Sequence, residues 1–79
     1  MSKYAFERSN ILTPQERVEA ARKCLRLIGE DANLDKMKTR DYEFYNDQTA
    51  RAKRITYRVS EGQLAWLRDI VAKYVTNSN

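Results

Sequence analysis

Apolar residues recur at helical spacing after the first dozen positions of the chain. Val18, Ala21, Leu25 and Ile28 are separated by three, four and three positions, and Cys24 lies beside them. This spacing places them on one face of an amphipathic helix, because a helix turns once in about 3.6 residues. The pattern predicts a helix over residues 14–28.

Both ends of this helix carry local signals. Thr13 is an N-cap residue, Pro14 suits the first helical position, and Glu16 follows Thr13 by three residues, as in a capping box. Gly29 is expected to end the helix in the left-handed conformation, which costs glycine little.

The middle of the chain has a second helical stripe with one polar interruption. Its members are Leu34, Met37, Asp41, Phe44 and Tyr45. This stripe predicts a helix over residues 34–50, with Asp31 or Asn33 as its cap.

The pattern changes before the last helix. Ile55, Tyr57 and Val59 alternate with polar residues, which is typical of extended chain, so a short extended link is expected here. Ser60 and Gln63 then form a second capping box, and Val59 with Leu64 matches a hydrophobic staple. A third helix is therefore predicted over residues 60–75.

Together these elements predict an all-α fold, a compact three-helix domain with an arm at residues 1–12 and a tail at 76–79. The predicted core consists of Leu12, Val18, Ala21, Leu25, Ile28, Leu34, Met37, Phe44, Leu64, Leu67, Ile70, Val71 and Tyr74. A chain of 79 residues suffices for one domain and buries a limited core.

The composition narrows the class of protein. No apolar run is long enough to span a membrane, and the first residues lack the apolar centre of a signal peptide, so we expect a cytoplasmic protein without membrane contact. The single cysteine, Cys24, cannot form an internal disulfide and is expected in the core.

The residue types argue against catalysis. The chain has no histidine, which removes the commonest general base and metal ligand, and one cysteine cannot build a zinc site. Neither glycine belongs to a phosphate-binding loop. We therefore expect a protein that is not an enzyme and that has no metal and no cofactor.

Positive charge is concentrated in the last third of the chain. Residues 51–79 hold six basic and two acidic side chains, within a net charge of +4 for the whole chain. The segment "RAKRITYR" contains the predicted nucleic-acid-binding residues Arg51, Lys53, Arg54, Tyr57 and Arg58. Arginine and lysine neutralise phosphates, and a tyrosine ring can stack on an unpaired base. Arg22, Lys23 and Arg26 would extend this surface, whereas the alternative interpretation is a solvated linker.

A second candidate surface is acidic and aromatic. It is formed by Asp41, Tyr42, Glu43, Tyr45 and Asp47, together with Trp66 at the edge of the last helix. Exposed aromatic residues often anchor protein partners, whereas a solvated helix face is the simpler interpretation of the acidic residues. The sequence also leaves open a homodimer through the last helix.

The residues Ser60, Gln63, Trp66, Leu67, Ile70 and Tyr74 follow the segment "YEFYND" and a basic link. This pattern, over residues 42–75, resembles the C-terminal part of small bacteriophage-encoded accessory proteins with a Ser-x-x-Gln-x-x-Trp-Leu helix. The resemblance implies a phage or prophage origin and an accessory role around nucleic acid.

Two functions follow from these patterns. The first is a phage-type accessory protein that binds nucleic acid, or a nucleic-acid-processing complex, through the basic link. The alternative is an inhibitor of a host machine, similar to an anti-CRISPR protein, that acts by protein–protein contact through the acidic and aromatic surface.

Overall fold

The computed structural model describes residues 12–75, and the first helix among these residues is α2, Pro14–Asp31. The predicted capping box is confirmed: the Thr13 N–H donates to Glu16 Oε1 at 2.9 Å, and the Glu16 N–H donates to Thr13 Oγ1 at 3.1 Å. The predicted arm, apart from Leu12, and the predicted tail lie outside the described residues.

The predicted end of this helix is wrong. The helix continues through Gly29 to Asp31, and neither glycine has a positive φ. Ala32 then adopts an extended conformation, and its N–H donates to the Ile28 carbonyl at 3.1 Å. Glycine lowers helix propensity by about 1 kcal/mol relative to alanine, which does not suffice to end a helix that is packed on its neighbours.

The predicted second helix is divided into two elements. Leu34–Lys36 forms a 3₁₀ helix, η1, and the α-helix α3 begins five residues later than predicted and spans Thr39–Ala52. Asn33, one of the two predicted caps, accepts a hydrogen bond from the Asp35 N–H at 3.1 Å, but it caps η1. The apolar pair at positions 34 and 37 fits a 3₁₀ turn as well as an α-helix, because residues three apart share a face in both.

The link is non-helical and the last helix is present, as predicted, but the first half of the link forms turns rather than extended chain. Residues 53–56 form turns and residues 57–60 have neither helical nor strand structure, after which α4 spans Glu61–Tyr74. The second capping box is present, with Ser60 N–H to Gln63 Oε1 at 3.0 Å and Gln63 N–H to Ser60 Oγ at 3.1 Å. Val59 and Leu64, the predicted staple pair, are both buried in the core.

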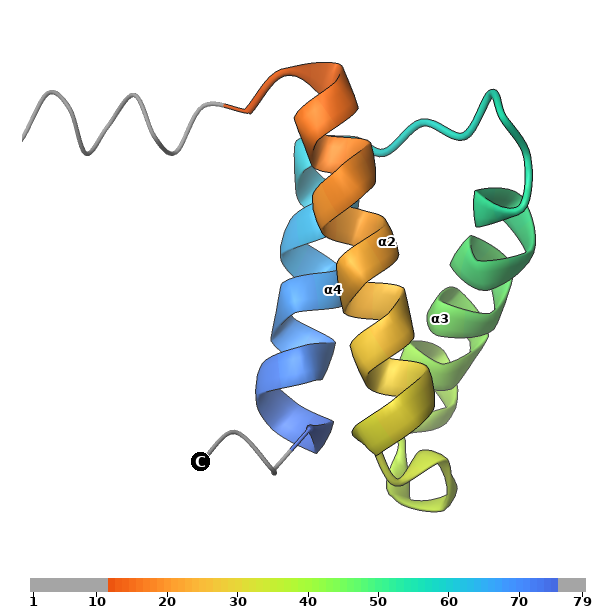
Figure 1. Ribbon diagram of the computed structural model, residues 1–79. Helices are drawn as coiled ribbons and strands as arrows, with labels where there is room; N and C mark the ends of the chain where they lie inside the picture. The colour runs from red at the N-terminus through yellow and green to blue at the C-terminus, as the bar shows by residue number, and fades with distance from the viewer. Residues whose placement is uncertain (1–11, 76–79) are drawn as a thin grey trace, which may run out of the picture.

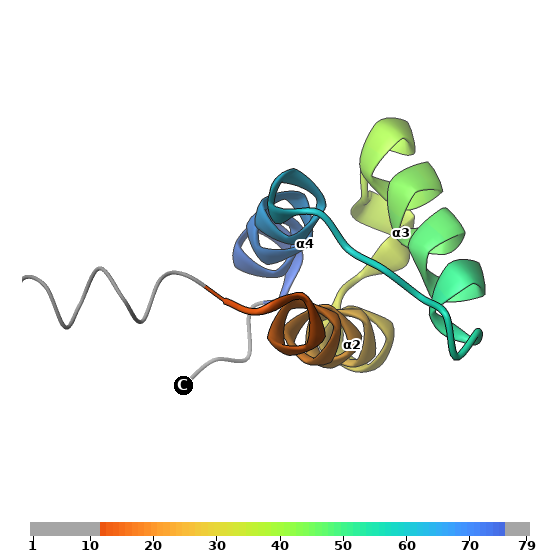
Figure 2. The same cartoon turned by 90° about the horizontal axis from the view of Figure 1, so that it is seen from above.

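The three α-helices form an all-α domain, and the described residues contain no strand (Figure 1). α2 and α4 run in the same direction and pack closely on each other, whereas α3 runs in the opposite direction. The link crosses from the end of α3 to the start of α4, at the end of the domain where α2 also begins (Figure 2). No described helix is both long and apolar enough to cross a membrane.

Most of the predicted core is buried between these helices. Of the predicted residues, Ala21, Leu25, Ile28, Met37, Leu64, Leu67 and Ile70 are buried. The others, Leu12, Val18, Leu34, Phe44, Val71 and Tyr74, are partly buried and pack against this core. The sequence interpretation did not place Ala52, Tyr57 and Val59 in the core, nor the polar Asp41 and Gln48, although all five are buried.

Candidate nucleic-acid interface

The basic segment begins where α3 ends. The helix gives way to turns, in which the Arg54 N–H donates to the Arg51 carbonyl at 3.1 Å and the Tyr57 N–H donates to the Arg54 carbonyl at 3.2 Å. The cations Arg51, Lys53, Arg54 and Arg58 are all exposed. No acidic residue occurs between Asp47 and Glu61, so this stretch of chain carries positive charge only.

Three of these cations share one hollow on the surface. Arg51, Arg54 and Arg58 line an open hollow of about 200 Å³ together with Thr56 and Tyr57. Arg51 also donates from Nε to Asp47 Oδ2 at 2.8 Å, which leaves its other four N–H groups for a further acceptor. Arginines from the end of α3 and from the link therefore line the same hollow.

The predicted stacking role of Tyr57 is wrong. Its side chain is only 4% exposed, and its hydroxyl donates to Gln48 Oε1 at 2.8 Å. Burial raises the pKa of this phenol. The guanidinium carbon of Arg22 lies 5.4 Å from the centre of the ring and covers it. A ring held in this way anchors the link in the core and cannot stack on a base.

Arg22 has a structural role that the sequence interpretation missed. Its Nη1 donates to the Ala52 carbonyl, and its Nη2 donates to the Arg54 carbonyl at 3.2 Å. The last carbonyls of a helix lack partners within the helix, and a cation also interacts favourably with the helix dipole at that end. Arg22 therefore joins α2 to the end of α3 and fixes the first turn of the link.

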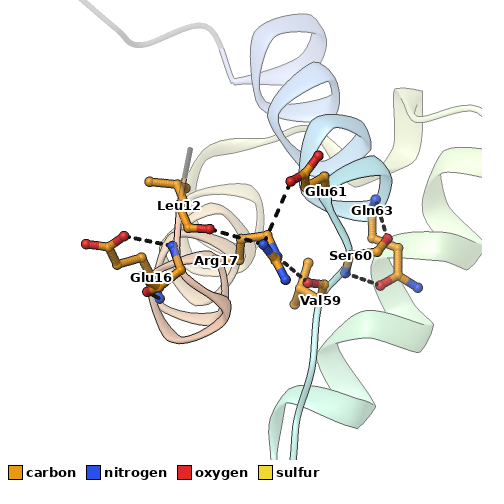
Figure 3. A network of polar contacts seen from close by, with 8 residues as sticks. Leu12, Glu16, Arg17, Val59, Ser60, Glu61 and Gln63 are labelled. Atoms are coloured by element: carbon orange, nitrogen blue, oxygen red, sulfur yellow. Dashed lines mark hydrogen bonds and ion pairs between the residues drawn. The ribbon is translucent and has the colours of Figure 1, made fainter. Parts of the chain in front are cut away.

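A second arginine fixes the far end of the link. Arg17 Nε donates to the Val59 carbonyl at 2.8 Å, and its Nη1 donates to the Leu12 carbonyl at 3.1 Å. Figure 3 shows this guanidinium between Leu12 and the start of α4, where Glu61 Oε2 lies 4.0 Å from Nη1. The link is thus attached to α2 on both sides of its exposed turn.

The predicted extension of the basic surface onto α2 is only partly present. Arg22 and Arg26 line an open groove of about 390 Å³ together with Lys53. Lys23 is exposed but does not line this groove.

The acidic and aromatic surface is largely used inside the protein. Asp41, predicted on a solvated helix face, is only 7% exposed. Its Oδ1 accepts from Trp66 Nε1 at 2.9 Å, and its Oδ2 accepts from the Tyr74 hydroxyl at 2.9 Å. The hydrogen bond from Trp66 lowers the pKa of this carboxyl group, and the hydrogen bond from Tyr74 and the charge of Lys73 act in the same direction. Together they outweigh burial, which raises the pKa.

The other residues of that surface have mixed positions. Trp66 is partly buried and stacks on Phe44, with ring centres 4.0 Å apart. The Tyr45 hydroxyl approaches Gly29, and Tyr45 is partly buried. Tyr42 is 41% exposed, and Glu43 and Asp47 are exposed, although Asp47 is paired with Arg51. The predicted surface is therefore reduced to the exposed edge of α3.

Chemistry-bearing groups are few in the described chain. Residues 12–75 contain no group of three or more metal-ligating side chains. Cys24 is buried as expected, and burial raises the pKa of its thiol, so the thiolate that would react is disfavoured.

The interpretation of the sequence also missed Ile55. This residue is 97% exposed, the most exposed large apolar side chain of the described residues. The sequence does not distinguish Ile55 from Tyr57 and Val59, because all three alternate with polar residues in the link although the last two are buried.

Comparison of the chain with models of protein families, with curated proteins and with solved structures finds no match.

Proposed function

We propose that this protein binds nucleic acid through the basic link, defined as Arg51, Lys53, Arg54 and Arg58. The observation that carries the proposal is the hollow that Arg51, Arg54 and Arg58 line together. Guanidinium groups are suited to phosphate oxygens, because each presents several donors in one plane. The role is that of a small accessory protein of phage type in the cytoplasm, without catalysis.

The rigidity of the link supports this proposal. Arg22 and Arg17 bond to backbone carbonyls on either side of the exposed turn, and Tyr57 holds the link in the core. The cations therefore project from a backbone that is already ordered, which lowers the entropy lost on binding. Only their side-chain torsions remain to be fixed by the ligand.

The number of cations sets the expected strength and salt dependence. Four phosphate contacts give a slope of about −3.6 for log K against log salt concentration on a duplex. Between 50 and 200 mM salt, affinity should therefore fall by about 150-fold. Binding of this kind is non-specific in sequence, because phosphate contacts fix position rather than read bases.

Fluorescence anisotropy with a labelled 20-base-pair duplex tests the proposal. The double variant Lys53→Gln/Arg54→Gln should bind more weakly, and its salt slope should fall to about −1.8 because two contacts are lost. The matched control is Lys36→Gln/Lys38→Gln, which removes the same charge at the opposite end of the domain. Equal losses in both variants would show that only net charge matters and would refute the basic link as a site.

A second candidate is binding to a host protein through the exposed edge of α3, as in a protein-directed inhibitor. The observation in its favour is Tyr42, which is 41% exposed and pairs with Tyr45 at a centroid distance of 6.4 Å. A pull-down from nuclease-treated host lysate, with the Tyr42→Ser variant as comparison, tests it. A partner retained equally by both forms would exclude this edge.

A further inference from the structure

The most exposed large apolar side chain of the described residues lies on the basic link. Ile55 is 97% exposed and follows Arg54 directly, with Lys53 and Arg58 nearby in the chain. It gains almost nothing from folding, because its surface stays in water. Exposed single apolar residues are common, so exposure alone does not indicate a site.

The turn that carries Ile55 has an unfavourable sequence for a turn. The Tyr57 N–H donates to the Arg54 carbonyl at 3.2 Å, so residues 54–57 form a turn with Ile55 and Thr56 at its centre. Such central positions usually hold Pro, Gly, Asn, Asp or Ser, whereas these two residues are β-branched. Places where a sequence departs from local preference without a gain in packing are often functional.

The turn is also held in place on both sides. The Arg54 carbonyl accepts from Arg22 Nη2 at 3.2 Å, and Tyr57 is buried with its hydroxyl bonded to Gln48. Ile55 is therefore presented outward on a fixed support, between cations that can bind phosphates.

Resting on the proposed function, we infer that the ligand is duplex DNA and that Ile55 is a wedge inserted from the groove against a base step. Proteins that bend DNA use apolar side chains, isoleucine among them, to separate neighbouring base pairs in the minor groove while cations hold the backbone. Single strands are disfavoured as the ligand, because sequence-tolerant binding to them relies on aromatic stacking and Tyr57 is buried.

Duplex RNA fits the wedge less well. Its major groove is too narrow for side chains, and its minor groove is wide and shallow. A single apolar residue on a turn matches the narrower minor groove of DNA.

The test uses Ile55→Asn, with Ile55→Leu and Thr56→Asn as controls. Because Ile55 is 97% exposed and asparagine suits a turn, Ile55→Asn should unfold at the same temperature as the natural chain. Its affinity for duplex DNA should fall about tenfold, with an unchanged salt slope because no phosphate contact is lost. Ile55→Leu and Thr56→Asn should bind as the natural chain does.

A duplex that carries 2-aminopurine gives an independent readout of insertion. The natural protein should raise the fluorescence of this base as it unstacks, whereas Ile55→Asn, added to saturation, should not. Unchanged fluorescence with the natural protein, or equal affinity for Ile55→Asn, would overturn the wedge and leave the basic link in place.

The remaining arms separate the two proposals. Tighter binding to a single strand or to duplex RNA than to duplex DNA would overturn the inference alone. Failure to bind any nucleic acid would overturn both it and the proposed function. Both would also be overturned if vesicles of anionic phospholipid bind the natural protein more tightly than Ile55→Asn while DNA binds neither.

Discussion

Replacement of Asp41 by alanine tests how α3 is held to α4. The Asp41 carboxylate accepts hydrogen bonds from Trp66 Nε1 and from the Tyr74 hydroxyl, both at 2.9 Å and both from α4. Lys73 Nζ lies 3.9 Å from Oδ2, but its side chain is 48% exposed, so water screens this pair. The two hydrogen bonds are therefore the main polar connection between the helices at this point.

The magnitude follows from these two bonds. A hydrogen bond to a charged group contributes about 1.5–3 kcal/mol, and water can replace part of this at the partly buried Trp66. We expect Asp41→Ala to lower the free energy of unfolding by about 2–4 kcal/mol. A chain of 79 residues has a total of about 4–12 kcal/mol, so the loss is large enough to measure and can leave the variant partly unfolded.

The pH dependence of folding stability is a second, independent test of the role of Asp41. The pKa of Asp41 is lowered in the folded state, first by the hydrogen bond from Trp66. The stability that ionised Asp41 contributes is therefore complete above its pKa in the unfolded chain, about 3.9. This stability is lost as the pH falls through the lower pKa of Asp41 in the folded protein. Asp41→Asn should be less stable than the natural chain at pH 7, and this difference should shrink towards pH 2.

Urea unfolding, followed by circular dichroism and by the fluorescence of the single Trp66, measures these differences. The control is Asp69→Asn, which removes an exposed carboxylate that bonds the same lysine at 3.1 Å and should leave the unfolding midpoint nearly unchanged. A loss of less than about 0.5 kcal/mol in Asp41→Ala would refute this role of Asp41. The same difference in stability between Asp41→Asn and the natural chain at pH 7 and at pH 3 would also refute it.

Three further variants test other contacts. Arg22→Met should lower stability by about 1–3 kcal/mol in thermal unfolding, because the Ala52 carbonyl at the end of α3 and the Arg54 carbonyl of the link lose their donor; an unchanged melting temperature would contradict this role. Gly29→Ala should change stability little, because the gain in helix propensity is offset by a close contact of 3.0 Å between the new Cβ and Tyr45 Oη. In a Tyr45→Phe background, which lacks this oxygen, the same substitution should stabilise the protein by about 1 kcal/mol. A double-mutant cycle without coupling would refute the contact. Tyr57→Phe should lose about 1–2 kcal/mol of stability, because the Gln48 oxygen loses its donor; an unchanged melting temperature would contradict a stabilising role for this hydrogen bond.

Features that depend on neighbours in the chain were predictable from the sequence. Both capping boxes join residues three apart, and both are present with the predicted partners. The apolar faces of α2 and α4 were equally readable, because a helix repeats its own geometry and its buried stripe needs no knowledge of the partner. The all-α class and the non-helical link followed from these local signals.

The predicted helix boundaries are wrong where a residue type or spacing is compatible with two local structures. Gly29 was expected to end α2, but its missing Cβ instead accommodates the close approach of the Tyr45 hydroxyl. Leu34 and Met37 were assigned to the second helix, whereas they belong to a 3₁₀ turn and its cap. In both cases the residue type or spacing fits two local structures, so the sequence pattern alone does not decide between them.

The sequence by itself determined the all-α class, the inward faces of α2 and α4, and the run of cations on the link. Only the tertiary structure decided which polar and aromatic side chains remain available to a ligand. Asp41 is buried by residues 25 and 33 positions away, and Arg22 covers Tyr57 from another helix. The physical reason is that a charge or a ring is removed from water by whatever packs against it, and that partner is set by how the helices dock.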